Sequence, residues 1–390
     1  MFRSPKHLGR WLAIAVAIGL VGCAVALAAK PPNPVTPAYR IVPFVSPFSP
    51  EGCNSVESQV MDLNDCGQAV GFEKFSDGTS PPVYQALHLN IAAGTYTLLA
   101  DGCLPSGVND LNQIVGERRL ADGRRVGMFL SAAGVAGAVD LPPLARLGHT
   151  QSAATAINGD GVVVGYSWND DETSASAAVW IVRVLGDAVS VHGPWDLPPL
   201  AGDARACAED LNELDGGLCQ VTGISFGATD DSYEAVVWTV AVAGTTATPG
   251  AAVSLVVNHA WSVGSGINDS GDVCGLVDVD NKAMPFLASA GETAQPLPVP
   301  RGTYYGHARD VNSLGEVVGS LDILSKGGWS DASYAYLWKD GEMVNLAKLI
   351  DPDSGWGRLR GASVINDAGT IGGYGLFDIG TRGFLLIRNP

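Results

Sequence analysis

The chain has 390 residues, with 40 acidic side chains against 23 basic ones, 49 glycines and 23 prolines. This excess of acids repels phosphate backbones and anionic membrane surfaces, so nucleic acid is not an expected partner. The glycines and prolines are dispersed among apolar runs, which indicates a folded protein with many turns and excludes a disordered chain.

The first residues have the pattern of a targeting segment. The pattern comprises a basic start, an apolar run and a small-x-small cleavage motif, at Arg3, Lys6, Arg10, Trp11–Ala29 and Ala26-Leu27-Ala28. This order is typical of a secretory signal peptide. We therefore expect residues 1–29 to be removed and the mature protein to be secreted, periplasmic or located at the surface of a bacterium.

Two alternatives for this segment stay open. Leu20-Val21-Gly22-Cys23 is similar to a bacterial lipobox, in which Cys23 would be lipidated and would anchor the chain to a membrane. The apolar run is also about as long as a short membrane span, so an uncleaved anchor is the third interpretation. Residues 30–38 contain KPPNPVTP and are expected to form a stiff spacer, which leaves 39–390 as one repeat domain.

One pattern recurs seven times after the spacer. It consists of an apolar residue, Asn, usually an acid, a spacer, Gly, a polar residue, two small or β-branched residues and Gly, as in INDSGDVCG at Ile267–Gly275. The repeat asparagines are Asn64, Asn109, Asn158, Asn212, Asn268, Asn312 and Asn366. Asn, Asp and Gly are turn residues, so each copy predicts a β-hairpin.

Each hairpin is followed by further strand signals. A short apolar run comes first, such as Ala335–Trp338, and many units end on another extended segment, such as Val139–Pro142. Four strands in a unit of roughly 40–50 residues are typical of one propeller blade. We therefore predict an all-β chain that forms a β-propeller with seven four-stranded blades.

The two chain ends complement each other. The last copy stops one strand short, just after Phe384–Leu386, whereas Tyr39–Phe44 is an extended segment that precedes the first copy. Pairing these segments would supply the missing fourth strand and remove an exposed sheet edge. We expect this N-terminal strand to close the ring, and we expect the protein to be a monomer.

The repeats also resemble a known family. Copies such as ATAINGDGVVVGY at Ala154–Tyr166, with a small-aromatic-Leu-Trp run such as AYLW at Ala335–Trp338, are similar to the repeats of the HAF family of bacterial extracellular repeat proteins. The resemblance covers residues 58 to 390. It implies bacterial export and a propeller-like fold, and it implies no activity and no catalytic residues.

Six cysteines follow the leader, and an even number in an exported chain indicates disulfides. Cys207 and Cys219 flank the turn of the fourth copy, which is four residues longer than in most copies. We therefore expect a disulfide between them across this hairpin. Cys274 occupies a position that holds Val in three other copies, so it is expected to be a buried free thiol.

Two motifs resemble functional sites but have structural interpretations. GISFG at Gly223–Gly227 matches a nucleophile elbow, but it lacks the strand-turn-helix context and continues the fourth copy. Asp62, Asp210 and Asp310 each precede a repeat Asn by two residues, as at the start of a calcium loop. No closing acid recurs at a fixed distance, so we favour turn chemistry over calcium and expect no other cofactor.

Two function classes follow from the repeats. Because no nucleophile or acid–base pair departs from them, we expect an exported non-catalytic scaffold that binds a glycan or a protein. The alternative is a propeller-fold glycan hydrolase or lyase at the mouth of the central channel. Its candidate residues are the acids that break the repeat, Asp170, Asp171, Glu209 and Glu213. A hydrolase would need carboxylates within about 5–10 Å of each other.

Ligand contacts are expected in the loops that break the repeat. The longest are Trp168–Ser176, Gly223–Glu234 and Leu324–Tyr334, each between a hairpin and the third strand of its unit. They share one position in the unit, so a propeller places them on one face. Exposed loop aromatics suit sugar or peptide binding, which makes Trp168 and Trp329 the candidate ligand-binding residues.

Overall fold

The computed structural model describes residues 37–389, except 101, 133–136, 172, 228–231, 257, 258, 260, 325–332 and 379. The expected signal peptide and the lipidation candidate Cys23 lie outside the described residues. The chain from Pro37 onward forms one compact unit of strands with two short 3-10 helices, η1 (Ala145–Leu147) and η2 (Leu346–Lys348). In the part of the chain that is described, no helix is long and apolar enough to span a membrane.

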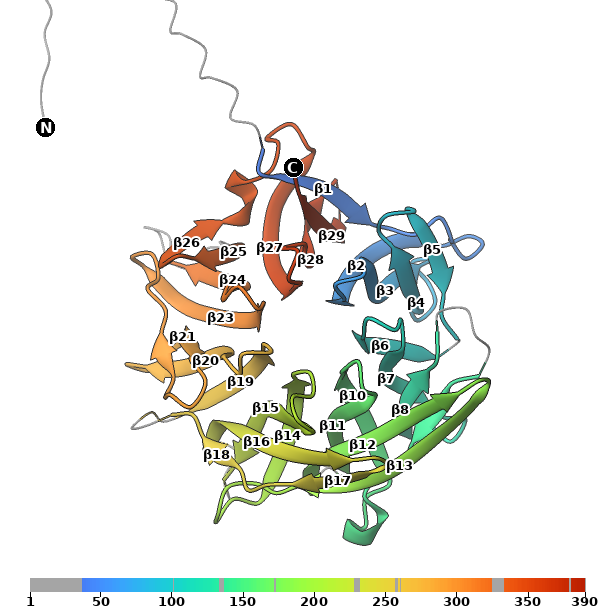
Figure 1. The fold of residues 1–390 in the computed structure, drawn as a ribbon. Helices are drawn as coiled ribbons and strands as arrows, with labels where there is room; N and C mark the ends of the chain where they lie inside the picture. The colour runs from blue at the N-terminus through green and yellow to red at the C-terminus, as the bar shows by residue number, and fades with distance from the viewer. Residues whose placement is uncertain are drawn as a thin grey trace, which may run out of the picture. The chain divides into compact units, whose positions relative to one another are not determined.

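Each repeat forms an antiparallel group of strands, and the groups surround a central axis (Figure 1). From the axis outward, the first three groups are β2 (Asn54–Leu63), β3 (Gln68–Ser76), β4 (Val83–Asn90) and β5 (Thr95–Leu98); β6 (Cys103–Val108), β7 (Ile114–Arg119), β8 (Arg125–Leu130) and β9 (Val139–Leu141); and β10 (Gln151–Ile157), β11 (Val162–Trp168), β12 (Ala175–Leu185) and β13 (Ala188–Leu197).

The next three groups follow the same order. They are β14 (Arg205–Leu211), β15 (Leu218–Phe226), β16 (Tyr233–Ala243) and β17 (Thr246–Pro249), with β18 (Val253–Ser254) also paired to β16; β19 (Ser262–Ile267), β20 (Val273–Val279), β21 (Lys282–Ala288) and β22 (Gln295–Pro296); and β23 (Thr303–Val311), β24 (Val317–Ile323), β25 (Ser333–Lys339) and β26 (Glu342–Asn345). Single parallel bridges join two pairs of neighbouring groups, Glu57 to Thr381 and Ala283 to Tyr305.

The last group joins the two ends of the chain. It contains β27 (Trp356–Ile365), β28 (Ile371–Phe377), β29 (Gly380–Arg388) and β1 (Tyr39–Phe44). Strand β1 lies antiparallel to β29, with Tyr39 opposite Arg388 and Phe44 opposite Gly383 (Figure 1). The prediction of an all-β propeller in which an N-terminal strand pairs with the last copy is therefore confirmed.

The repeat turns have the predicted backbone. Gly271 and Gly315 adopt φ values of 83° and 72°, and Asn112, which replaces Gly in the second copy, has a φ of 61°. The closing glycines lie where strands converge: a Cβ on Gly71 or Gly165 would be 2.1 Å from a carbonyl oxygen of the neighbouring strand. Both observations explain why the pattern requires Gly at these places.

The core is built between neighbouring blades. Trp180 and Trp238 are fully buried, and each indole N–H donates to a carbonyl oxygen near the end of the preceding blade, on Pro142 at 2.9 Å and Pro198 at 2.6 Å. Burying one large apolar side chain contributes about 1.5–3 kcal/mol. The tryptophans at the third-strand position thus bind successive blades together.

Every innermost strand contains a β-bulge at the same place, three residues before its repeat Asn. There the register to the second strand shifts by one residue and leaves one residue unpaired. The bulge residues are Met61, Ser106, Thr155, Glu209, Ser265, Arg309 and Ser363. Bulges redirect side chains, and these seven all line the central channel.

The expected disulfide between Cys207 and Cys219 is wrong. All six cysteines of the described chain are free. Cys207 pairs with Ile224, whereas Cys219 lies five residues earlier on β15 and pairs with Val240. Five residues along a strand span roughly 16 Å, well beyond the Cα separation of a disulfide. The extra residues of the fourth copy lengthen its turn without shifting the strand register. Cys274 is buried and free, as predicted.

Candidate binding site in the central channel

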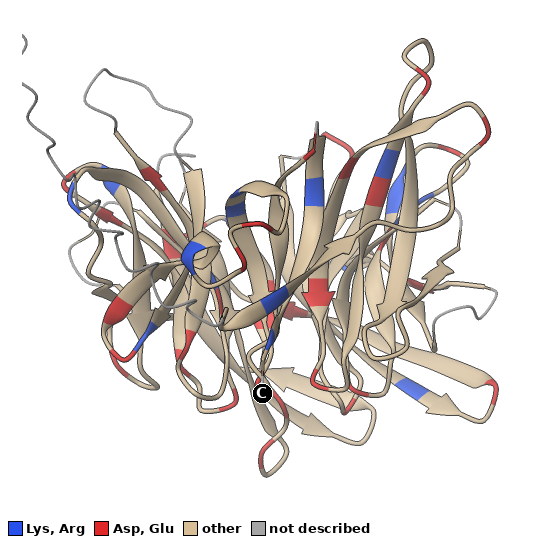
Figure 2. Ribbon diagram, turned by 90° about the horizontal axis from the view of Figure 1, so that it is seen from above, with Lys and Arg blue, Asp and Glu red and all other residues tan. Residues whose placement is uncertain are grey.

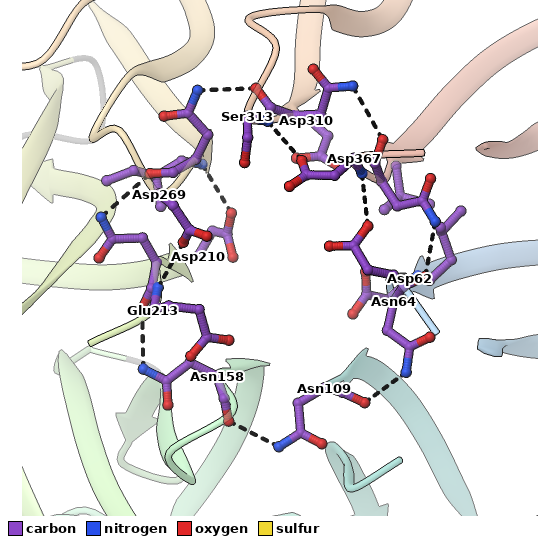
Figure 3. A pocket seen from close by; sticks show the side chains of 18 of the residues that line it. Asp62, Asn64, Asn109, Asn158, Asp210, Glu213, Asp269, Asp310, Ser313 and Asp367 are labelled. Atoms are coloured by element: carbon purple, nitrogen blue, oxygen red, sulfur yellow. Dashed lines mark hydrogen bonds between the residues drawn. The ribbon is translucent and has the colours of Figure 1, made fainter. Parts of the chain in front are cut away.

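The seven repeat asparagines form a closed ring of hydrogen bonds at one end of the channel (Figure 3). The side-chain amide of each Asn donates to the backbone carbonyl oxygen of the Asn in the next copy, over 2.7 to 3.3 Å. The last bond runs from Asn366 to Asn64, 302 residues apart. The side-chain oxygen of each Asn accepts a bond from a backbone N–H within its own turn. Each Asn therefore both shapes its turn and ties two blades together.

A ring of carboxylates adjoins the asparagines. It consists of the acids that follow a repeat Asn, Asp65, Asp110, Glu213, Asp269 and Asp367. Several accept hydrogen bonds from the backbone of the preceding copy, such as Asp110 from the N–H of Asp65 at 3.0 Å. Burial raises the pKa of Asp65, and the neighbouring carboxylates raise it further, against the hydrogen bond from Asp367. The mouth of the channel is therefore strongly acidic.

Three further carboxylates bridge blades beneath the asparagines. Asp62, Asp210 and Asp310 each accept one hydrogen bond from the next residue and another from the residue before the following repeat Asn. In Asp62 these bonds measure 2.8 Å to Leu63 N and 2.7 Å to Val108 N. Burial raises the pKa of Asp62 to about 7 and that of Asp310 to about 6, although the backbone bonds oppose the shift.

These contacts give the three Asp residues a structural role that the sequence did not reveal. Within the described ranges, no group of three or more His, Cys, Asp or Glu side chains has an arrangement that could hold a metal ion. Calcium binding is the less favoured interpretation of these residues, and it stays untested. Both oxygens of each carboxylate are already engaged by backbone N–H groups, so a metal would have to displace those bonds.

Two cavities lie one behind the other along the channel. The outer cavity, of about 240 Å³, is lined by the Asn ring and the carboxylate ring. The inner one, of about 110 Å³, is lined by the seven bulge residues. They share Asp62, Asp210, Asp310 and Val364 as lining residues, so the inner cavity adjoins the outer one.

The seven bulge residues form one layer of the channel wall, called the bulge layer below. It differs from the two rings above it because its two charged side chains have no partner in the described structure. The hydroxyls of Ser106 and Thr155 donate to carbonyl oxygens of the following blade, Ala154 O at 2.7 Å and Ala208 O at 3.0 Å. By contrast, neither Glu209 nor Arg309 forms a hydrogen bond or ion pair with any described residue. Burial raises the pKa of Glu209 to about 7, and the positive charge of Arg309 partly opposes this.

The structure brings together only two of the four candidate acids. Glu209 lines the inner cavity and Glu213 the outer one. Asp170 and Asp171 follow β11 at its other end, where their carboxylates accept bonds from the hydroxyls of Thr150 and Thr173. The four acids therefore do not form one site. The acids that do converge at the mouth are the ones that follow a repeat Asn. The sequence analysis assigned them to turns and did not predict that they lie together.

The aromatic candidates give a different result from the one expected. Trp168 belongs to the end of β11 and is only 3% exposed, so the expectation of an exposed loop ring is wrong for this residue. The guanidinium of Arg125 lies 4.7 Å from the centre of its ring, and the ring of Tyr166 lies 5.2 Å away. Trp329 and parts of all three loops lie outside the described residues.

Solved structures share this architecture. The β-propeller domain of the Trilobed protease from Pyrococcus furiosus matches with a TM-score of 0.51 and 9% identity over 86% of this chain and 96% of that one. This chain is a β-propeller. The acylaminoacyl peptidase of Pyrococcus horikoshii matches with a TM-score of 0.50 and 10% identity over 84% of this chain, which spans 51% of the peptidase.

At these identities the likeness extends to the fold. No family model and no curated protein matches the chain. The Pyrococcus furiosus domain is described as having an open velcro topology, whereas β1 and β29 pair along six residues in this propeller.

Proposed function

We propose that the chain is an exported, non-catalytic binding scaffold built from HAF-type repeats, which acts as a monomer outside the cytoplasm of a bacterium. The observation that supports this most directly is the use of polar groups around the axis. The repeat asparagines and the three bridging aspartates use their side-chain oxygens or amides to hold neighbouring blades. Groups held this way stabilise the ring and are not free to act as nucleophile or general base.

The charge of the surface narrows the class of partner. Acidic residues occur in loops at both ends of the strands (Figure 2), and the whole chain has a formal net charge of −17. Such a surface favours a neutral glycan or a basic protein over an anionic partner. Binding to a basic protein should weaken as salt rises, whereas binding to a neutral glycan should change little.

The experiment compares binding with turnover. The purified protein is applied to an array of neutral and acidic glycans and to immobilised basic and acidic proteins, and the bound glycans are then analysed for cleavage. We expect retention on a neutral glycan or a basic protein, with the glycan intact. Absence of binding to every surface would contradict the proposal.

Cleavage of a bound glycan would support the alternative, a propeller-fold hydrolase or lyase. The two acids that reach the channel make this alternative testable. Cleavage that disappears in Glu209→Gln or Glu213→Gln, and persists in Asp171→Asn as the matched control, would establish catalysis in the channel and overturn the scaffold proposal.

A further inference from the structure

The bulge layer is the part of the channel in which the seven copies differ most. Every copy has Asn at the ring position, whereas the bulge position holds four hydroxyls, one thioether, one carboxyl and one guanidinium. A bulge residue is unpaired in its strand, so the fold requires a bulge there but no particular side chain. The chemistry of this layer is thus free to serve a ligand.

Arg309 and Glu209 are the two charged members of the layer. Their blades are separated by one blade, which contributes Ser265 between them. Arg309 is exposed to the lumen, and neither charged side chain bonds to a described residue. The guanidinium donors of Arg309 are therefore available to a ligand, and a carboxylate would accept charge-assisted hydrogen bonds from them.

The two charges and the acidic mouth together restrict the ligand. A purely anionic ligand would pair with Arg309 but would be repelled by the carboxylate ring that lines the adjoining outer cavity. A purely cationic ligand would be attracted by that ring but repelled by Arg309 in the inner cavity. A ligand with one group of each sign satisfies both conditions.

We propose that the bulge layer binds a small zwitterion of the amino-acid type, with its carboxylate on Arg309 and its ammonium on Glu209. The guanidinium offers two parallel N–H donors to a carboxylate. Ser265 belongs to the blade between those of the two charged residues, and its hydroxyl forms a hydrogen bond with His307 Nε2 at 2.7 Å. Met61, which is 38% exposed, lies in the first blade and presents a thioether to the rest of the ligand. This site is separate from the loops that would bind a macromolecular partner.

Isothermal titration calorimetry of the purified protein tests the proposal. The probes are glycine, acetate as its carboxylate half and methylammonium as its ammonium half. We expect glycine to bind and each half to bind at least tenfold more weakly. Arg309→Gln and Glu209→Gln should each weaken glycine binding at least tenfold, and Arg309→Lys should weaken it less because it keeps the charge but loses the paired donors.

Arg301→Gln is the matched control, because Arg301 is exposed and lies outside the channel cavities, and it should leave binding unchanged. Absence of glycine binding at millimolar concentration would overturn the proposal. So would acetate that binds as tightly as glycine and is indifferent to Glu209→Gln, which would indicate a simple carboxylate site. If Arg309→Gln does not fold, as judged by circular dichroism, Arg309→Lys and Glu209→Gln decide the question. A failure here leaves the array result, and with it the scaffold proposal, unaffected.

Discussion

The Asn ring and the bulge layer lie on the same seven inner strands, three residues apart, yet they differ in every chemical respect. The ring has one residue type, which is buried and bonded to the next blade at each of its seven positions. The bulge layer has five residue types, and its two charged members have no described partner. Both layers face the same axis and occupy the same blades.

The comparison shows that the fold requires a particular residue in the Asn ring and accepts several residue types in the bulge layer. The Asn position bonds to the next blade in every copy and keeps one residue type, because a missing bond would open the closed ring. In the bulge layer, only Ser106, Thr155 and Ser265 bond to the next blade within the described structure. A position aimed into the lumen by a bulge carries no such constraint. Substitutions in the ring should therefore change stability, whereas substitutions in the bulge layer should change binding.

The largest loss of stability is expected from a change in the last blade, where the two ends of the chain close the ring. Deleting Tyr39–Phe44 removes the outer strand of the last blade and weakens the support for the bond from Asn366 to Asn64. The loss of one strand with its ladder and packing should cost several kcal/mol, on the order of the largest single effects known. Urea unfolding measures it. Deletion of residues 31–36 is the control, and equal midpoints for the two deletions would show that β1 does not close the ring.

A point substitution in the ring should have the next largest effect. Asn366→Ala removes both the interblade bond and the turn bond from Thr370 N, and should cost about 2–6 kcal/mol at about 1–3 kcal/mol for each of the two buried groups left unpaired. Ser363→Ala, in the bulge of the same strand, should cost less than about 0.5 kcal/mol. Comparable losses in the two variants would remove the distinction between the layers.

The fold was predictable because its signals are local. Asn, Gly and the flanking apolar residues mark each hairpin within nine residues, or thirteen in the fourth copy, and their recurrence implies a ring. The interblade bonds were not predictable in this way, because their partners lie 44 to 56 residues apart, or 302 at the closure. Each repeat Asn serves both its own turn and the ring between blades. The sequence pattern reveals only the role in the turn, because the residues of the turn are close in sequence.

Register explains the remaining failures. A β-bulge depends on how two strands pair, and the sequence of one strand does not encode that pairing. The acids of the repeat were therefore assigned to turns, and Glu209 and Arg309 were not placed together. The disulfide between Cys207 and Cys219 failed for the same reason, since their proximity in sequence gave no register. Trp168 was assigned to a loop, although its strand extends far enough to include and bury it.

The turns allow a smaller and cleaner test. Gly315 has a φ of 72° and open space around it, so a substitution there acts through backbone strain alone. Gly315→Val should destabilise by about 1–3 kcal/mol, because β-branched residues resist positive φ. Gly315→Asn should cost markedly less, since Asn112 adopts this conformation in the second copy. Identical melting temperatures for the two variants would contradict the turn assignment.

The bridging aspartates predict a dependence of stability on pH. Burial raises the pKa of Asp62 to about 7, above its unfolded value near 3.8. The folded protein therefore holds this proton more tightly, so the contribution to stability is complete below pH 3.8 and is lost as the pH rises to about 7. Asp62→Asn should reduce the loss of stability between pH 5 and pH 8 in urea unfolding. Asp171→Asn should not, because the hydrogen bonds from Thr173 keep the pKa of Asp171 below this range. If the dependence of unfolding free energy on pH is the same in Asp62→Asn and in the parent protein, Asp62 does not titrate between pH 5 and pH 8.

The most direct test of the difference between the two layers measures stability and affinity on the same variant. Arg309→Gln should keep the urea midpoint of the parent protein while its affinity for glycine falls at least tenfold. The contradictory result is a midpoint lowered as far as in Asn366→Ala, with glycine binding unchanged, because Arg309 would then support the ring and the bulge layer would not be a binding site.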